Sequence, residues 1–75
     1  MSKKRDLSRY LWNGLDTDTY EVIEIRPQDR HNAAIIMRNR TASDKYLWCV
    51  QFKRYGHYFE THQQVLDYCT SRQWL

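Results

Sequence analysis

Basic and aromatic side chains are interspersed in the middle of this 75-residue chain, and this combination is suited to binding an anionic ligand that contains aromatic rings. Six cations lie between Arg30 and Tyr58 against one acid, Asp44. Arginine can hold a phosphate with two hydrogen bonds, and an exposed tyrosine or histidine ring can stack on a base. With the cations near the N-terminus, the predicted nucleic-acid-binding set is Lys3, Lys4, Arg5, Arg38, Arg40, Lys53, Arg54, Tyr55, His57 and Tyr58.

The same cations have a simpler explanation, since Arg and Lys on a small antiparallel sheet guard its edges against aggregation. The distribution of charge favours a second function. Residues 1–9 carry a net charge of +3, residues 10–29 of −4 (five acids against Arg26) and residues 30–75 of +4. Such division suits a docking surface, so the alternative prediction is a protein-interaction module: an inhibitor, an adaptor, an accessory subunit or a homodimer.

The residues that could hold a metal or act as nucleophiles do not have the required spacing. Zinc ligands come in pairs two to four residues apart, whereas His57 and His62 are five apart and His31 is remote. Cys49 and Cys69 form no close pair, and Cys69 falls on the predicted buried face of a helix, where a thiolate is disfavoured. We therefore predict a protein that is not an enzyme, with no catalytic residues, metal or cofactor.

Strands are predicted where β-branched and aromatic residues gather. The clearest lies over 46–54, where Trp48, Val50 and Phe52 alternate with more polar positions and predict one buried face. Two others are predicted at 20–26, ending at Pro27, and at 33–40. A turn at 54–57 and a short fourth strand at 58–59 complete the set.

Helical spacing marks the two ends of the chain. Thr61 and Gln64 have the spacing of a capping box, and the helix that follows places Val65, Leu66 and Cys69 on one face. Near the N-terminus, Leu7, Tyr10 and Leu11 predict a short helix or helical turn over 4–12, ended by Asn13-Gly14. We expect this segment, or a second copy of the chain, to cover the second apolar face of the sheet.

These elements predict an α+β fold: a small antiparallel three- to four-stranded meander, with a C-terminal helix packed on one face and a short N-terminal helical turn. Residues 1–9 are expected to form a basic, partly flexible arm, and residues 10–75 a single domain.

One junction resembles a known architecture. Tyr58-Phe59-Glu60-Thr61 leads from a Trp-bearing strand region into a helix that carries Val65 and Tyr68. This stretch resembles the strand-to-helix junction of three-strand-plus-helix DNA-binding domains, such as those of plant ethylene-response factors and some phage integrases. The resemblance covers about a dozen residues and implies an architecture, because a shared fold does not by itself confer a function.

The hydrophobic runs are short. None approaches the ~18 apolar residues of a membrane span, and no apolar region follows the charged residues at the N-terminus. We therefore expect a cytoplasmic protein with reduced thiols and no membrane partner.

Overall fold

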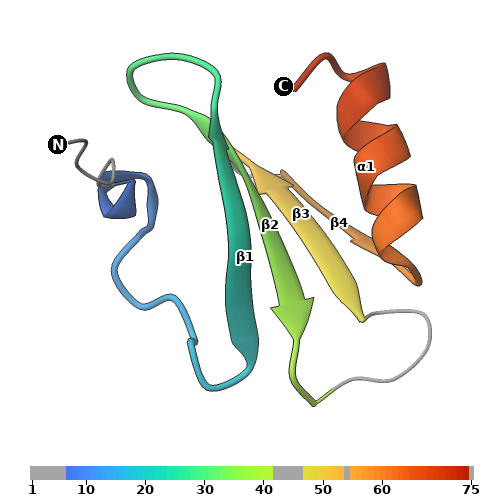
Figure 1. The fold of residues 1–75 in the computed structure, drawn as a ribbon. Helices are drawn as coiled ribbons and strands as arrows, with labels where there is room; N and C mark the ends of the chain where they lie inside the picture. Colours follow the sequence, from blue (N-terminus) through green and yellow to red (C-terminus); the bar gives the residue numbers. More distant parts are fainter. Residues whose placement is uncertain (1–6, 42–46, 54, 75) are drawn as a thin grey trace, which may run out of the picture.

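The computed structural model describes residues 7–41, 47–53 and 55–74, and shows a four-stranded antiparallel sheet followed by a helix (Figure 1). The strands β1 (Tyr20–Pro27), β2 (Ala33–Asn39), β3 (Trp48–Phe52) and β4 (Tyr55–Phe59) pair in chain order, and α1 (His62–Ser71) comes last. The predicted α+β meander with a C-terminal helix is therefore confirmed. Within the described ranges, no helix has both the length and the apolar character needed to cross a membrane.

The helix α1 begins at the predicted capping box. Thr61 Oγ1 accepts a hydrogen bond from the backbone N–H of Gln64 at 3.2 Å, and Gln64 Oε1 accepts one from the backbone N–H of Thr61 at 3.2 Å. Together these bonds satisfy two donors that the first helical turn leaves without a partner inside the helix. The cap fixes where α1 starts, and so which of its faces meets the sheet.

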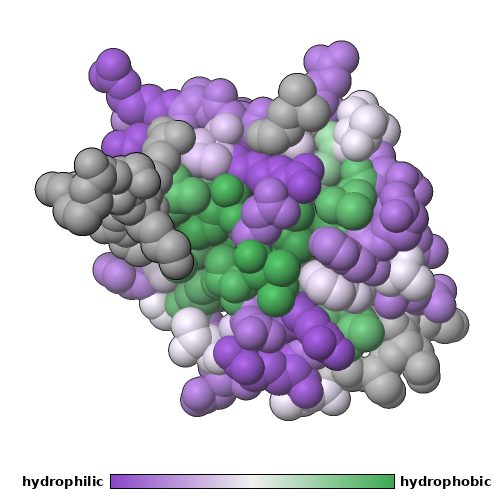
Figure 2. Space-filling model, viewed as in Figure 1, coloured by the Kyte–Doolittle hydropathy of each residue, from purple (hydrophilic) through white to green (hydrophobic). Residues whose placement is uncertain are grey.

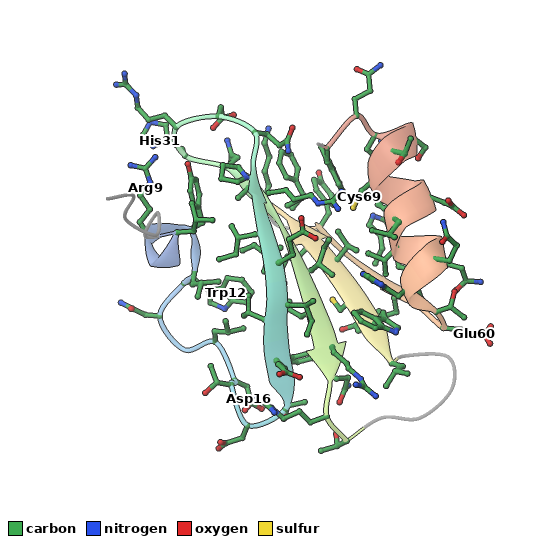
Figure 3. All side chains as sticks on the ribbon, in the orientation of Figure 1. Arg9, Trp12, Asp16, His31, Glu60 and Cys69 are labelled. Carbon is green, nitrogen blue, oxygen red and sulfur yellow. The ribbon has the colours of Figure 1, made fainter. Side chains whose placement is uncertain are left out.

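One face of the sheet lies under α1, and we call its packed centre the helix core. It consists of Ile36, Val50, Val65 and Cys69, all fully buried. Figure 3 shows Cys69 on the side of α1 that meets the sheet. Trp48, Phe59 and Trp74 close this core at its rim, and His62 in the first turn of α1 stacks on Trp48 with ring centroids 4.6 Å apart.

The opposite face carries a second core, which we call the N-terminal core. Its buried members are Ile35, Met37 and Cys49. Leu11 and Leu15, from the segment that precedes β1, pack against it together with Tyr20, Val22 and Ile25 of β1. The molecule is thus layered, with α1 on one side of the sheet and the N-terminal segment on the other (Figure 1).

The N-terminal segment contains less helix than the 4–12 stretch predicted. A 3-10 turn, η1 (Ser8–Tyr10), is present, whereas Leu11 and Trp12 are not helical. Residues 4–6 of the predicted stretch lie outside the described residues. Asn13-Gly14 forms a turn, with Gly14 at a φ of 88°, a conformation that glycine adopts without steric cost. It is not the predicted helix stop, because the 3-10 turn has already ended at Tyr10.

A bulge in β1 explains why this strand is apolar on both parities. The register shifts between Val22 and Glu24, so Val22 pairs with Met37 and Ile25 with Ile35. Both side chains therefore join the N-terminal core, while Ile23 remains 43% exposed. Figure 2 shows hydrophobic side chains across the middle of the view, where β1 lies in front. Pro27 is the last residue of β1, and a proline is tolerated there because β1 is an edge strand.

The predicted turn at 54–57 is wrong. Tyr55, Gly56 and His57 belong to β4, which pairs with β3 from Tyr55 opposite Phe52 to Phe59 opposite Trp48. The chain reverses at Lys53 instead, whose φ of 56° lies in the left-handed region. Gly56 suggested a turn, but an edge strand tolerates a glycine, and β4 is an edge strand.

Candidate functional site

A groove lined by rings and cations lies between the β3–β4 turn and the end of α1. We call it the aromatic groove, and its volume is about 570 Å³. The residues that line it are Phe52, Lys53, Tyr55, His57, Tyr68, Arg72 and Trp74. No Asp or Glu is among these described lining residues.

The turn at Lys53 and the pairing of β3 with β4 build one side of the aromatic groove. Phe52 lies opposite Tyr55, and Val50, which is in the helix core, lies opposite His57. Directly paired residues project to the same side of a sheet. Tyr55 and His57 therefore project to the side covered by α1.

The end of α1 builds the other side of the groove through a Schellman motif. The backbone N–H of Trp74 donates to the carbonyl of Cys69 at 2.8 Å, and that of Gln73 donates to the carbonyl of Thr70 at 3.0 Å. Gln73 takes the left-handed position, with a φ of 62°, where glycine is usual. The motif turns the chain sharply after α1 and returns Trp74 to the sheet.

Ring contacts then fix Trp74 in place. Its ring stacks on Phe52 with centroids 4.7 Å apart and meets Tyr68 edge-on at 5.6 Å. A guanidinium N–H of Arg26 donates to the Trp74 carbonyl at 3.2 Å, and Arg26 is itself paired with Glu24 at 2.8 Å. The wall of the groove is therefore held from both β1 and α1.

Tyr55 differs from the other rings of the groove. It is 71% exposed, and none of the ring contacts among the described residues involves it. By contrast His57 lies against Tyr68, with ring centroids 5.0 Å apart. The faces of Tyr55 are thus available to a flat ligand without any rearrangement of the packed rings.

Two cations lie over rings at the groove. Lys53 Nζ is 5.5 Å from the ring centroid of Phe52, and Arg72 Cζ is 5.4 Å from that of Tyr68. Such contacts hold a cation near an aromatic surface while its remaining donors face solvent. The groove therefore offers stacking surfaces together with positive charge.

The structure separates the predicted nucleic-acid-binding residues into groups. Lys53, Tyr55 and His57 line the aromatic groove. Arg38 and Arg40 lie at the other end of the sheet, since Arg38 pairs with Trp48 whereas Lys53 directly follows Phe52 at the far end of β3. Lys3, Lys4, Arg5 and Arg54 lie outside the described residues.

Arg38 and Arg40 are surrounded by both signs of charge. Arg38 lies opposite Glu21 in the pairing of β1 with β2. A pocket of about 300 Å³ at this end is lined by Glu21, Arg38, Asn39, Arg40 and Leu47. Arg40 Nε donates to the carbonyl of Thr17 at 3.3 Å, in the turn between Asp16 and Asp18. This end of the sheet is therefore of mixed charge, unlike the aromatic groove.

Tyr58 projects away from α1, to the face of the N-terminal core. It pairs with Cys49 on β3 and is 49% exposed. A hydrogen bond with the Tyr58 side chain, and then burial, raise the pKa of Tyr20 to about 12. The two tyrosines thus reach toward each other across Met37 and Cys49, so Tyr58 helps to cover this face.

Sequence reasoning missed part of the groove. The sequence pattern predicts Phe52 as a core residue alone, and the predicted binding set does not include Tyr68, Arg72 or Trp74. A signal was present, because Tyr68 and Arg72 are four residues apart and therefore share one helix face. Their distance from Lys53 and Tyr55 in the sequence hid the connection.

The remaining reactive groups do not form a metal site in the described part of the chain. No cluster of three or more His, Cys, Asp or Glu side chains is placed to hold an ion. Both cysteines are buried free thiols. Burial raises the pKa of each, that of Cys49 to about 11, so neither is activated as a nucleophile in the folded state.

Comparison with known proteins adds no family to this description. No protein-family model matches the chain, and searches of curated proteins and of solved structures find no significant match.

Proposed function

We propose that this protein is a non-enzymatic binding module that takes single-stranded nucleic acid in the aromatic groove. The observation that carries the proposal is the exposed ring of Tyr55 in one groove with Lys53 and Arg72, where none of the described lining residues is acidic. Proteins that bind single strands combine stacking rings with positive charge in this way, because every base has a flat face and every phosphate between two nucleotides is negatively charged.

The exposed ring of Tyr55 favours a single strand over a duplex as the ligand of the groove. Bases in a duplex are stacked on one another, so their faces cannot reach a protein ring, whereas unpaired bases can be splayed out onto one. The exposed ring of Tyr55 supports this choice, and in the proposed complex Lys53 and Arg72, which lie over the rings of Phe52 and Tyr68, would meet the adjoining phosphates.

The test is binding of a fluorescently labelled oligonucleotide, measured by anisotropy at several salt concentrations. Affinity should fall steeply with salt, since each neutralised phosphate releases counterions. Tyr55→Ala should weaken binding by about fivefold or more, as expected for loss of one stacked base. Arg72→Gln should weaken binding and also reduce the salt dependence.

Arg38→Gln is the matched control, because it removes the same charge at the other end of the sheet. It should leave affinity nearly unchanged. The proposal fails if neither DNA nor RNA binds at low salt, or if Arg38→Gln weakens binding as much as Arg72→Gln does.

A protein partner is the second candidate, at the end of the sheet that carries Arg38 and Arg40. Mixed charge around Glu21 and the exposed Ile23 on the same strand favour it, because protein interfaces combine an apolar centre with a charged rim. Its simplest form is a homodimer. Light scattering over a concentration series should then show a dimer that Ile23→Asp abolishes, and a wild-type chain that stays monomeric would remove this form.

A further inference from the structure

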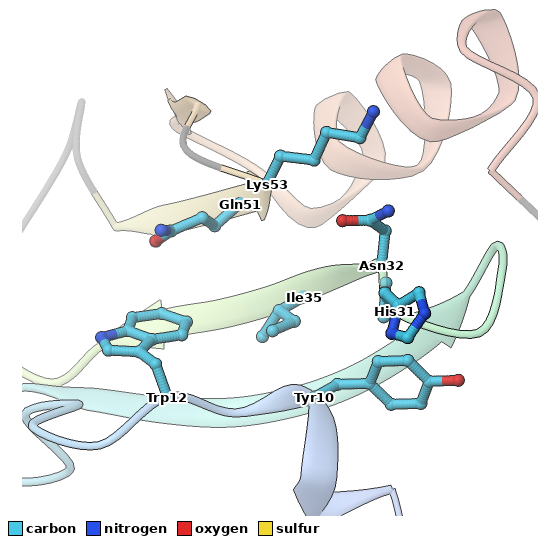
Figure 4. A pocket seen from close by; sticks show the side chains of 8 residues that line it. Tyr10, Trp12, His31, Asn32, Ile35, Gln51 and Lys53 are labelled. Carbon is cyan, nitrogen blue, oxygen red and sulfur yellow. The ribbon is translucent and has the colours of Figure 1, made fainter.

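A second pocket lies on the opposite side of the β3 end from the aromatic groove (Figure 4). We call it the N-terminal pocket, and its volume is about 460 Å³. The N-terminal segment supplies one wall and the sheet the floor. The lining residues are Tyr10, Trp12, His31, Asn32, Ala33, Ile35, Gln51 and Lys53.

Hydrogen bonds hold the wall of the N-terminal pocket in place. Tyr10 Oη donates to the carbonyl of Asp29 at 3.1 Å, and a guanidinium N–H of Arg9 donates to the carbonyl of Arg30 at 3.4 Å. Figure 3 shows Arg9 and His31 on the same side of the molecule. The floor includes Ala33 and Ile35, which are buried residues of β2.

Trp12 and Gln51 give this pocket the means to bind a base. Trp12 is 40% exposed, so part of its indole is open to a ligand. Gln51 is a half-buried residue of β3, and its side-chain amide makes no hydrogen bond within the described residues, which leaves its donor and its acceptor unused there. Both side chains lie at one end of the pocket in Figure 4. A ring stacked on Trp12 would have its polar edge near an amide, the group that reads base edges in pairs of hydrogen bonds.

Lys53 connects the two pockets, since it lines both of them. The left-handed turn at this residue places it where the sheet ends, between the side covered by α1 and the side covered by the N-terminal segment. A chain of anions that leaves the aromatic groove past Lys53 therefore arrives directly at the N-terminal pocket.

The local charges are compatible with an anionic strand. The loop beside the pocket contains one acid, Asp29, whose carboxylate accepts hydrogen bonds from the backbone N–H groups of His31 and Asn32, both at 2.8 Å. The side-chain amide of Asn32 also donates to it. The carboxylate is thus occupied within its own loop, while Lys53 and His31 are the ionisable lining residues other than Tyr10.

We propose that the N-terminal pocket is a second nucleobase site for the same single strand, with a base stacked on Trp12, its edge toward Gln51, and the backbone passing Lys53. This inference rests on the proposed function, because it extends the strand that the aromatic groove binds. It makes the binding site a track that continues around the end of the sheet.

Oligonucleotides of different lengths separate the two sites. One of about three nucleotides should fill only the aromatic groove, and one of about twelve should reach both sites. Trp12→Ala should weaken binding of the long oligonucleotide by about fivefold or more and leave the short one unchanged, whereas Trp12→Phe should retain most of the affinity. Tyr55→Ala should weaken both. Circular dichroism would verify that each variant is folded.

The two proposals fail in different ways. If the short oligonucleotide binds and Trp12→Ala leaves the long one unaffected, the N-terminal pocket is not a base site, while the aromatic groove remains one. Equal weakening of both lengths by Trp12→Ala also overturns the second site. If no oligonucleotide of either length binds at low salt, both proposals are wrong.

Discussion

The two faces of this sheet are covered by different means. One lies under α1, a capped helix that closes through a Schellman motif and leaves Ile36 and Val50 fully buried. The other lies under a segment with a 3-10 turn, which contributes Leu11 and Leu15 and leaves the N-terminal pocket above Ile35. In a chain too short for a large core, α1 completes the packing over Ile36 and Val50 and leaves a groove only beside its C-terminal end. The irregular N-terminal segment instead leaves a pocket directly above Ile35, a buried residue of the other core.

The largest test of this comparison uses two neighbours on β2 that point to opposite faces. Ile36→Ala should cost about 4 kcal/mol of unfolding free energy, because Ile36 is fully buried and lines none of the three pockets described above. Ile35→Ala should cost about 2 kcal/mol, since its site already borders a pocket that water can enter. Urea denaturation of both variants measures the difference directly, and an equal or greater loss for Ile35→Ala would contradict it.

A smaller effect is expected at the start of α1. Thr61→Ala removes the hydroxyl that accepts from Gln64 and should cost about 1 kcal/mol. Thr70→Ala, an exposed threonine late in the same helix, is the matched control and should be nearly neutral. If the two variants lose the same stability in urea, the cap is not what secures this cover.

Low pH should destabilise the fold through two carboxyls that lie outside α1, those of Asp16 and Asp29. The hydrogen bond from the Thr19 side chain holds the pKa of Asp16 below its usual value, and that from the backbone N–H of His31 does the same for Asp29. A carboxyl with a lower pKa in the folded state stabilises the fold above the unfolded-state value, about 3.9, and loses this contribution as pH falls through the folded-state value. Stability should therefore fall below about pH 4.

Substitution shows whether these two carboxyls are responsible. The double variant Asp16→Asn and Asp29→Asn should be less stable at neutral pH and change less on acidification. Asp18→Asn, in the same turn as Asp16, is the matched control and should cost little stability at neutral pH, because the Asp18 carboxylate accepts no hydrogen bond in the described structure. Unfolding curves recorded at a series of pH values measure this. If the unfolding free energy of the double variant changes with pH as much as that of the wild type, these two carboxyls are not responsible.

The helix-covered face was largely predictable, because its signals are local. The alternation of Trp48, Val50 and Phe52 identifies the buried side of β3, and Thr61 with Gln64 identifies the start of α1. Each pattern lies within a few residues, so short-range geometry decides the outcome.

The N-terminal face and the candidate site were less predictable, because they depend on particular backbone choices. The bulge near Ile23 and the left-handed conformations of Lys53 and Gln73 occur at residue types that do not favour them. The resulting fold brings Tyr55 and Tyr68 to one groove and Lys53 and Trp12 to one pocket. Residues so distant in sequence leave no shared pattern for a local rule to detect.

The two cysteines extend the comparison of the faces to their motions. Cys49 lies in the N-terminal core and Cys69 in the helix core, on opposite sides of one sheet. Because burial suppresses both thiolates, a thiol reagent reacts with either only after the layer above it has opened. The rate at which each cysteine reacts therefore reports how often the layer above it opens. Because an irregular segment covers the N-terminal core, we expect Cys49 to react faster than Cys69.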